Sequence, residues 1–392
     1  MRESAIMSQT CPACNGDSRF LSNWTYSGLG ESIFNYTAEY FECPDCGLVY
    51  VANITDQTLS IFYQSECSYS ERSHFDIHSP ENINKYGAYR KLIVDFGMGD
   101  VNISDIGCGR GGFITWLVSQ GWRGLCVGVD IDTKSIPSKG DLMPRGSSVR
   151  FKNGGALNLP FEDNSQTLLT YFHVLEHIKN IDGVLAEAFR VLDESGSVLI
   201  EVPDAERYKD VPVGGIFWFS IREHIFHYSV ASLVSALSRN GFSVRKIERS
   251  MLPTPEFIYP SLIIIANKST ERSITPVKDG VAISEFLLES KKALIDQSSL
   301  IQEKLTEYSK LVFWGCSNEF FSLFPCVKNN DLVVCDISKI KQSSSIQGMP
   351  IRDPNSIDPD GMLVIPSCLH GNAIEDAALK RGWKRENIVR LN

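Results

Sequence analysis

The segment FSIREHIFHYS, residues 219–229, places Glu223, His224 and His227 within one short stretch. An imidazole, with a pKa near ~6.5, can take up a proton at neutral pH, and a neighbouring carboxylate can orient it. The segment therefore predicts a proton-transfer site. The alternative from composition alone is an ordinary strand-to-helix turn.

Four cysteines are paired near the start of the chain, as CPAC and CPDC: Cys11, Cys14, Cys43 and Cys46. Each pair can direct two thiolates at one ion, and four thiolates satisfy tetrahedral zinc without leaving an open position. We therefore predict a structural Zn²⁺ site. The 28 residues between the pairs exceed the commonest spacing and predict an aromatic hairpin around Trp24 to Phe41.

A glycine-rich turn, DIGCGRGGF, follows a strand-like stretch. Glycines let such a turn adopt positive φ and let a ligand approach the backbone. Asp130 ends the next strand-like stretch, 19 residues after Gly111, where a carboxylate can accept both ribose hydroxyls. Asp105 suits a ligand with an ammonium group better than a pyrophosphate. The turn therefore favours an adenosyl ligand that carries an amino acid over a dinucleotide.

The elements that must position these residues alternate between strand and helix from about Val101 onward. Apolar runs such as 125–132, 167–174 and 196–202 predict strands, and 183–192 and 230–240 show helical spacing. Such alternation predicts an α/β fold, a doubly wound parallel sheet with helices on both faces. A helical segment at 285–310 then leads to a smaller α/β domain.

The overall composition limits the classes of molecule that the chain is expected to bind. The chain of 392 residues has a net charge of −9 and a pI near 5.4, which argues against nucleic acid as a partner. No apolar run approaches the ~20 residues that span a bilayer, so no membrane association is expected. Without a secretory signal at the N-terminus we expect a cytoplasmic protein, a monomer or weak oligomer.

The motifs DIGCGRGGF, VGVD, GGALNLPFEDNS, HVLEH and AEAFRVLDESGSVLIEVP occur in the order typical of class I S-adenosylmethionine (SAM)-dependent methyltransferases, which the chain resembles. The resemblance implies a Rossmann-like domain and SAM as cofactor. It places Asp105, Gly107, Gly109, Gly111 and His173 around the methionine end, Asp130 at the ribose, and Ala156 and Leu157 beside the adenine. Gly155 stands where many members have an aspartate for the adenine amino group.

Over nearly its whole length the chain also resembles the three-domain sugar C-methyltransferases, which act on nucleotide-linked deoxysugars. This implies an N-terminal zinc-binding domain at 1–58, a methyltransferase domain at 59–272, and a helical linker with a Rossmann-like domain at 273–392. The substrate would be a small molecule, a nucleotide-linked keto sugar. O-methylation of a sugar or another metabolite, a zinc-ribbon rRNA methyltransferase and a non-catalytic SAM-binding protein are the alternatives.

Within that resemblance, Glu223 and His224 match the family's Glu-His pair, and His224 would be the general base. Carbon attack also needs a donor to the enolate oxygen, for which Tyr69, His177 or Tyr228 could serve. A structural role for His177 is an equal alternative. For His227 and Tyr228, packing against the next helix is the favoured role. The aromatic run at 217–219 could form either a wall over a sugar ring or part of the core.

Overall fold

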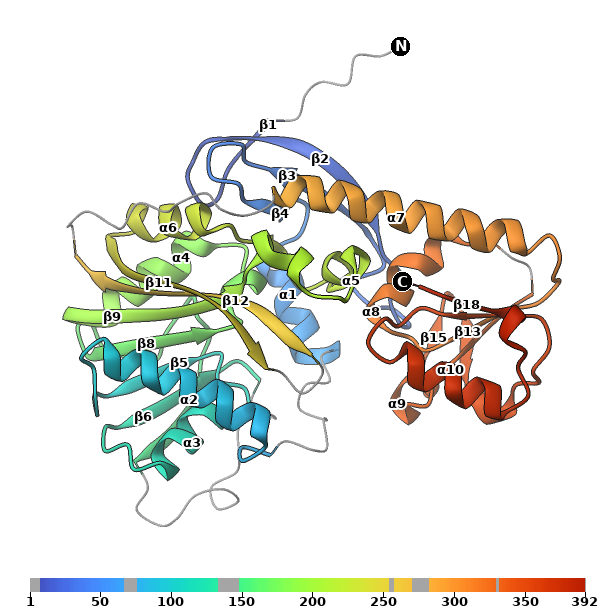
Figure 1. Ribbon diagram of the computed structural model, residues 1–392. Coiled ribbons are helices and arrows are strands. Elements are labelled where there is room, and N and C mark those ends of the chain that lie inside the picture. The colour runs from blue at the N-terminus through green and yellow to red at the C-terminus, as the bar shows by residue number, and fades with distance from the viewer. Residues whose placement is uncertain are drawn as a thin grey trace.

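The computed structural model describes residues 8–66, 76–132, 148–253, 257–269, 282–328 and 331–391. Three sheets follow one another through these ranges (Figure 1): an N-terminal sheet, a central sheet and a C-terminal sheet. The long helix α7 (Ile283–Lys304) extends from the N-terminal sheet toward the C-terminal sheet. The expected domain boundaries stay a prediction.

The central sheet has seven strands in the order β11-β12-β9-β8-β5-β6-β7. Their bounds are β5 (Ile103–Ile106), β6 (Cys126–Asp130), β7 (Val149–Asn153), β8 (Gln166–Phe172), β9 (Leu192–Pro203), β11 (Phe242–Pro253) and β12 (Ile258–Lys268). The first five are parallel, as expected. The expectation of a wholly parallel sheet is wrong for β12, which runs antiparallel to β9 and β11. β11 and β12 are consecutive and pair along almost their whole length, and a short connection forces adjacent strands to be antiparallel.

Successive residues of the central strands face opposite sides of the sheet. Leu168 belongs to the apolar cluster that includes residues of α2 (Pro80–Asp95) and α3 (Gly112–Ser119), whereas Leu169 belongs to the cluster that includes residues of α4 (Ile181–Val191) and α6 (Val230–Arg239). Both faces are therefore covered by helices, as the buried apolar runs predict. This arrangement aligns the carboxyl ends of the parallel strands at one edge, where open α/β sheets bind ligands.

The N-terminal sheet has the order β1-β2-β3-β4-β10. Its first four strands are consecutive: β1 (Ser8–Thr10), β2 (Asp17–Thr25), β3 (Thr37–Glu42) and β4 (Val49–Val51). Strands β2 and β3 form the expected aromatic hairpin. The fifth strand, β10 (Phe226–His227), comes from the Glu-His segment and pairs antiparallel with β4. A short helix, α1 (Asp56–Ile61), and a π-helical turn at 62–66 follow β4. The histidine segment is therefore hydrogen-bonded directly to the sheet that carries the cysteines.

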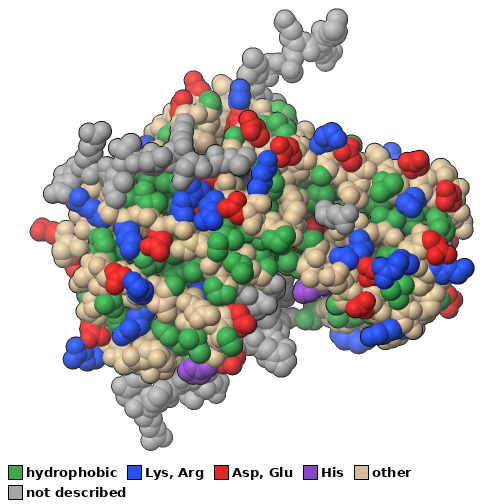
Figure 2. Space-filling model, in the orientation of Figure 1, with side chains coloured by type: hydrophobic (Ala, Val, Ile, Leu, Met, Phe, Trp, Pro, Cys, Tyr) green, Lys and Arg blue, Asp and Glu red, His purple; other side chains and the backbone are tan. Residues whose placement is uncertain are grey.

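The C-terminal sheet has the order β15-β16-β14-β13-β17-β18 and is parallel except for β15. Its elements are β13 (Leu311–Trp314), α8 (Asn318–Leu323), β14 (Leu332–Cys335), α9 (Lys339–Gln342), β15 (Ser345–Ile346), β16 (Met349–Arg352), β17 (Met362–Ile365), α10 (Gly371–Lys380) and β18 (Ile388–Arg390). The expected smaller α/β unit is thus present. On the face drawn in Figure 2, basic and acidic side chains are interspersed. No helix in the described ranges is long and apolar enough to cross a membrane.

Three segments distant in sequence meet at α8. The Trp24 indole donates to the Ser322 hydroxyl at 2.9 Å, and that hydroxyl also lies 2.7 Å from the hydroxyl of Ser220. Ser220 ends α5 (Gly215–Ser220), which lies between the central and C-terminal sheets in Figure 1. Because all three polar groups are buried, these hydrogen bonds join the three units in one arrangement.

Candidate functional site

The glycine turn between β5 and α3 has the backbone that its composition predicts. Gly107, Gly109 and Gly111 have φ values of 71°, 53° and 68°. A Cβ on Gly107 would lie 2.5 Å from a methyl of Val174, and one on Gly111 would lie 2.3 Å from the ring of Phe151. A Cβ on Gly109 would meet nothing within 4 Å. The turn therefore packs tightly on both sides and is open at Gly109, where a ligand can approach the backbone.

Two carboxylates stand at the carboxyl ends of β5 and β6. Asp105 is buried and accepts a hydrogen bond from Thr170 at 2.7 Å; burial raises the pKa of Asp105 to about 7. Asp130 accepts the backbone N–H groups of Gly109, at 2.7 Å, and Asp132, at 2.8 Å. Burial raises the pKa of Asp130 as well. An ammonium group beside Asp105 and ribose hydroxyls beside Asp130 suit this pair of acids.

The expected adenine end adjoins Asp130, whose backbone carbonyl accepts the amide of Gly154 at 3.1 Å. Ala156 is buried, whereas Leu157 is 39% exposed. Ile131, which follows Asp130, is also 39% exposed, and a Cβ on Gly155 would lie 3.2 Å from its side chain. Exposed Ile131 and Leu157 could both contact an aromatic base. Sequence reasoning missed Ile131, although an apolar residue directly after the ribose acid was a usable signal. The residues present thus fit SAM.

A second acidic group, also missed, lies at the carboxyl ends of β8 and β9. His173, which has φ of 56°, lies 3.1 Å from Glu176 through Nδ1 and 3.6 Å from Glu201 through Nε2. Burial lowers the pKa of His173, but the charge of Glu201 and the hydrogen bond to Glu176 outweigh it and raise the pKa to about 10. Glu201 also accepts hydrogen bonds from Tyr89 and Ser261. A cationic His173 is therefore held between two buried carboxylates.

The Glu176–His177 turn meets the Glu-His segment. His177 and His224 are in edge-to-face contact, with ring centroids 4.7 Å apart. The Nδ1 atom of His177 lies 3.0 Å from the backbone carbonyl of Glu223, and the N–H of Ile225 donates to the carbonyl of Glu176 at 2.9 Å. Because a carbonyl can only accept, His177 is the donor. Three expected site residues therefore lie together, with Glu223 contributing its main chain to the contact with His177.

His224 is 7% exposed, and its Nδ1 atom has no hydrogen-bond partner. Burial, followed by the charges of His177, His227 and His173, lowers the pKa of His224 well below its ordinary value. The imidazole is therefore neutral at pH 7 and available to accept a proton. Its reduced basicity means that a substrate proton must be acidic, or made so by its surroundings.

The remaining aromatic residues of the segment serve the core. His227 is fully buried and lies 3.1 Å from the Tyr208 hydroxyl; Tyr228 donates to the carbonyl of Leu175 at 3.4 Å. Trp218 stacks on Tyr208 with the ring centroids 4.1 Å apart, and Phe217 and Phe219 are buried as well. Residues 217–219 were considered either as a wall over a sugar ring or as part of the core, and in the structure they are part of the core. Tyr69 lies outside the described residues.

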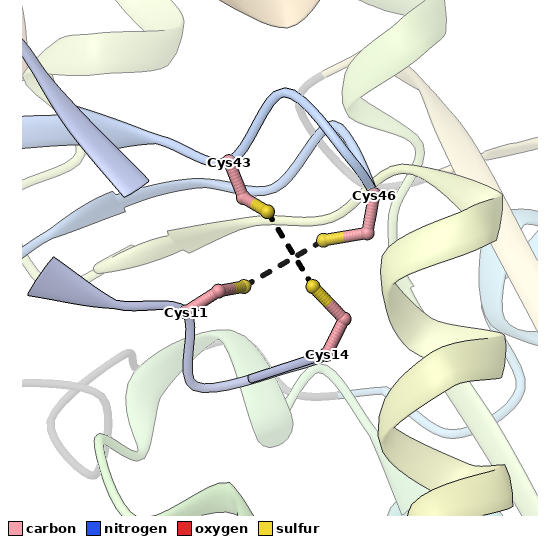
Figure 3. A group of neighbouring side chains, drawn as sticks. All are labelled: Cys11, Cys14, Cys43 and Cys46. Atoms are coloured by element: carbon pink, nitrogen blue, oxygen red, sulfur yellow. Dashed lines mark hydrogen bonds between the residues drawn. The ribbon is translucent and has the colours of Figure 1, made fainter. Parts of the chain in front are cut away.

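The four paired cysteines converge on one point (Figure 3). Their sulfurs lie within 4.8 Å of one another; Cys11 and Cys46 are separated by 3.6 Å, and Cys14 and Cys43 by 3.4 Å. Sulfurs on tetrahedral Zn²⁺, at ~2.3 Å from the metal, stand about 3.8 Å apart. The Gly16 amide also donates to the Cys14 sulfur at 3.4 Å. The donor set and its dimensions fit Zn²⁺ bound by all four thiolates.

The central sheet contains the part of the chain that matches a known protein family. Residues 104–200 match the family described as a methyltransferase domain. This stretch is therefore similar to a methyltransferase domain. It runs from β5 into β9 and includes the glycine turn, Asp130 and the Glu176–His177 turn. The domain match supports SAM as the cofactor, and the expected methyltransferase fold is confirmed for this part of the chain.

Individual relatives also match over only part of the chain. A demethylmenaquinone methyltransferase of Lactobacillus johnsonii is 32% identical over 99 residues, which cover 24% of this chain and 40% of that protein. An ajmaline N-methyltransferase of Rauvolfia serpentina is 30% identical over 103 residues, 25% of this chain and 35% of that protein. The chain thus spans less than half of these relatives. A solved SAM-dependent methyltransferase structure from Methanosarcina mazei is 23% identical, with a TM-score of 0.37, and covers 46% of this chain and 98% of that one.

Proposed function

We propose that the chain is a SAM-dependent methyltransferase that methylates a small molecule, a nucleotide-linked keto sugar, at carbon. The observation that carries the proposal is the position of the His177–His224 pair. The Glu176–His177 turn begins directly after Val174, which packs on Gly107 of the glycine turn. The pair therefore adjoins the site that fits the methionine end of the cofactor.

When bound, SAM supplies an electrophilic methyl group. The chain would hold its ammonium group at Asp105 and its ribose at Asp130. His224, neutral and buried, would take the proton that the acceptor loses, and His177, whose ring is in contact with His224, would position that base. A positioned base contributes about 10² to 10⁴ in rate, whereas holding two reactants in line can contribute far more. Loss of the base should therefore slow the reaction without removing cofactor binding.

O-methylation of a sugar is the second candidate, because one buried imidazole can take a proton from a hydroxyl as well as from carbon. The low basicity of His224 favours an acceptor whose proton is acidified by a neighbouring keto group. The zinc centre, the Glu-His segment and the C-terminal α/β unit all agree with the sugar C-methyltransferase resemblance.

The test is incubation of the purified chain with methyl-labelled SAM and a panel of nucleotide-linked keto and hydroxy sugars. We expect label on a carbon next to a keto group, located by NMR. Label on oxygen would select O-methylation. Cofactor binding by calorimetry without transfer to any sugar would refute the substrate class, and absence of SAM binding would refute the enzyme.

A further inference from the structure

A second group of metal-ligand atoms lies beside the glycine turn. In the ranges that the structure describes, Glu176, His177 and His224 each offer one ligand atom within 4.8 Å of the others. The first two belong to one 3₁₀ turn after β8, and His224 comes from the segment just before β10. One carboxylate and two imidazoles are a frequent ligand set for first-row divalent cations.

Two of these side chains have buried polar atoms without a partner. Glu176 is fully buried, and its Oε2 atom accepts no hydrogen bond; His224 is 7% exposed, and its Nδ1 atom is equally unpartnered. Native structures rarely leave such groups unpaired, because desolvation is costly. A cation between the two side chains would satisfy a carboxylate oxygen and an imidazole lone pair together.

Hydrogen bonds with neighbouring groups orient His177 and Glu176 and leave a possible metal-binding atom on each. His177 donates from Nδ1 to the Glu223 carbonyl at 3.0 Å, which leaves a lone pair on Nε2, and this Nε2 lies 3.8 Å from Oε1 of Glu176. Metal-binding histidines usually donate their other ring N–H to such a carbonyl or carboxylate. The Oε1 atom of Glu176 is in turn held at 3.1 Å from His173. Ligands on one cation stand about 3 Å apart, so the three side chains need to close by about 1 to 2 Å.

We propose that Glu176, His177 and His224 bind one divalent first-row transition cation, and that the bound cation prevents His224 from accepting a proton. The second half rests on the proposed function, in which His224 is the base. Proton and cation compete for the same imidazole, so the site would make methyl transfer sensitive to transition metals. This centre is distinct from the four cysteines, which lie in the N-terminal sheet.

The binding test uses the full chain loaded with one zinc per molecule and titrated with Co²⁺, whose absorption distinguishes thiolate ligands from nitrogen and oxygen ligands. We expect one further equivalent, with a spectrum that lacks thiolate charge-transfer bands. Glu176→Gln and His177→Gln should each weaken Co²⁺ binding at least about tenfold. His78→Gln, which changes an exposed histidine, is the matched control and should bind as the wild type does.

The SAM affinity of each variant, measured by calorimetry, reports whether that variant is folded. If one of the two ligand variants does not fold, the other still tests the site. Absence of a second equivalent, or a second equivalent that survives both ligand variants, would overturn the site. In the activity arm we expect methyl transfer to fall at least about tenfold when Co²⁺ occupies the site. Full occupancy without such a loss would overturn the competition with the proton. Failure of the proposed function is distinguishable, because the chain with zinc at the cysteines and no Co²⁺ added would then already be inactive.

Discussion

The Nδ1–H group of His177 donates to the backbone carbonyl of Glu223 across 3.0 Å. Together with the hydrogen bond from the Ile225 amide to the Glu176 carbonyl, this contact joins the turn after β8 to the segment before β10, two parts of the chain that are distant in sequence. It also places the rings of His177 and His224 in edge-to-face contact. The orientation of His177, which contacts the proposed base His224, therefore depends on the main-chain carbonyl of the residue that precedes that base.

The first prediction concerns His224. We expect His224→Ala to reduce methyl transfer at least about a hundredfold, because a positioned base is worth about 10² to 10⁴. SAM affinity, measured by calorimetry, should stay within about twofold, since Asp105 and Asp130 are untouched. His78→Ala serves as the surface control. Full turnover of His224→Ala on the true acceptor would exclude His224 as the base.

The second prediction concerns pH and Asp105. Burial raises its pKa to about 7, so the carboxyl is partly protonated at neutral pH. The ammonium group of SAM favours the ionised form, and binding should therefore release a proton. SAM affinity should rise as pH increases through about 7 and fall below it. Calorimetry across this range should show a weaker pH dependence for Asp105→Asn; identical profiles for the two proteins would contradict this assignment.

The third prediction concerns the zinc centre. We expect about one zinc per chain by metal analysis, and loss of it in Cys43→Ser, because three thiolates bind zinc more weakly than four. Strand β4 begins three residues after Cys46, and the Val51 amide donates to the carbonyl of Ile225 at 2.9 Å. Hydrogen exchange at Val51 should therefore accelerate when zinc is lost. A folded, metal-free wild type would refute the centre, and unchanged protection of Val51 would refute its coupling to the histidine segment.

The fourth prediction concerns Ser229, the N-cap of α6. Its hydroxyl accepts the Ser232 amide at 3.0 Å in a capping box and donates to the carbonyl of Cys46. Ser229→Ala should lower the free energy of unfolding by about 1 to 2 kcal/mol. Urea denaturation measures this change. Ser343→Ala, which alters a serine of the C-terminal unit, is the control. An equal decrease in the free energy of unfolding in both variants would show that the Ser229 cap does not stabilise the protein beyond what an ordinary serine contributes.

Several features followed from sequence because they depend on neighbours in the chain. The Cys-x-x-Cys pairs needed only short spacing to predict a thiolate centre, and the glycine turn with Asp130 needed only one strand, turn, helix and strand. Their structural settings, with positive φ at Gly107 and converging sulfurs, agree with those expectations. The hairpin between β2 and β3 was equally local.

Other features depended on contacts between distant segments and could not be predicted. The family resemblance separated His224 from His227, for which packing was the favoured role, but the contact of His224 with His177 and that of the fully buried His227 with Tyr208 were not predictable. The sequence shows that Glu201 is an acid within an apolar run. It does not show that this carboxylate, on β9, lies beside His173, which follows β8, and favours the protonated imidazole.

The sequence by itself determined the chemistry that is available: four thiolates, a glycine turn with two acids, and a histidine segment. Only the tertiary structure decided which groups meet. Strand β10 pairs with β4, so the sheet that carries the cysteines also holds the segment that carries His224. That pairing consists of main-chain hydrogen bonds, which any residue other than proline can both donate and accept. No side-chain pattern in the sequence therefore predicts it.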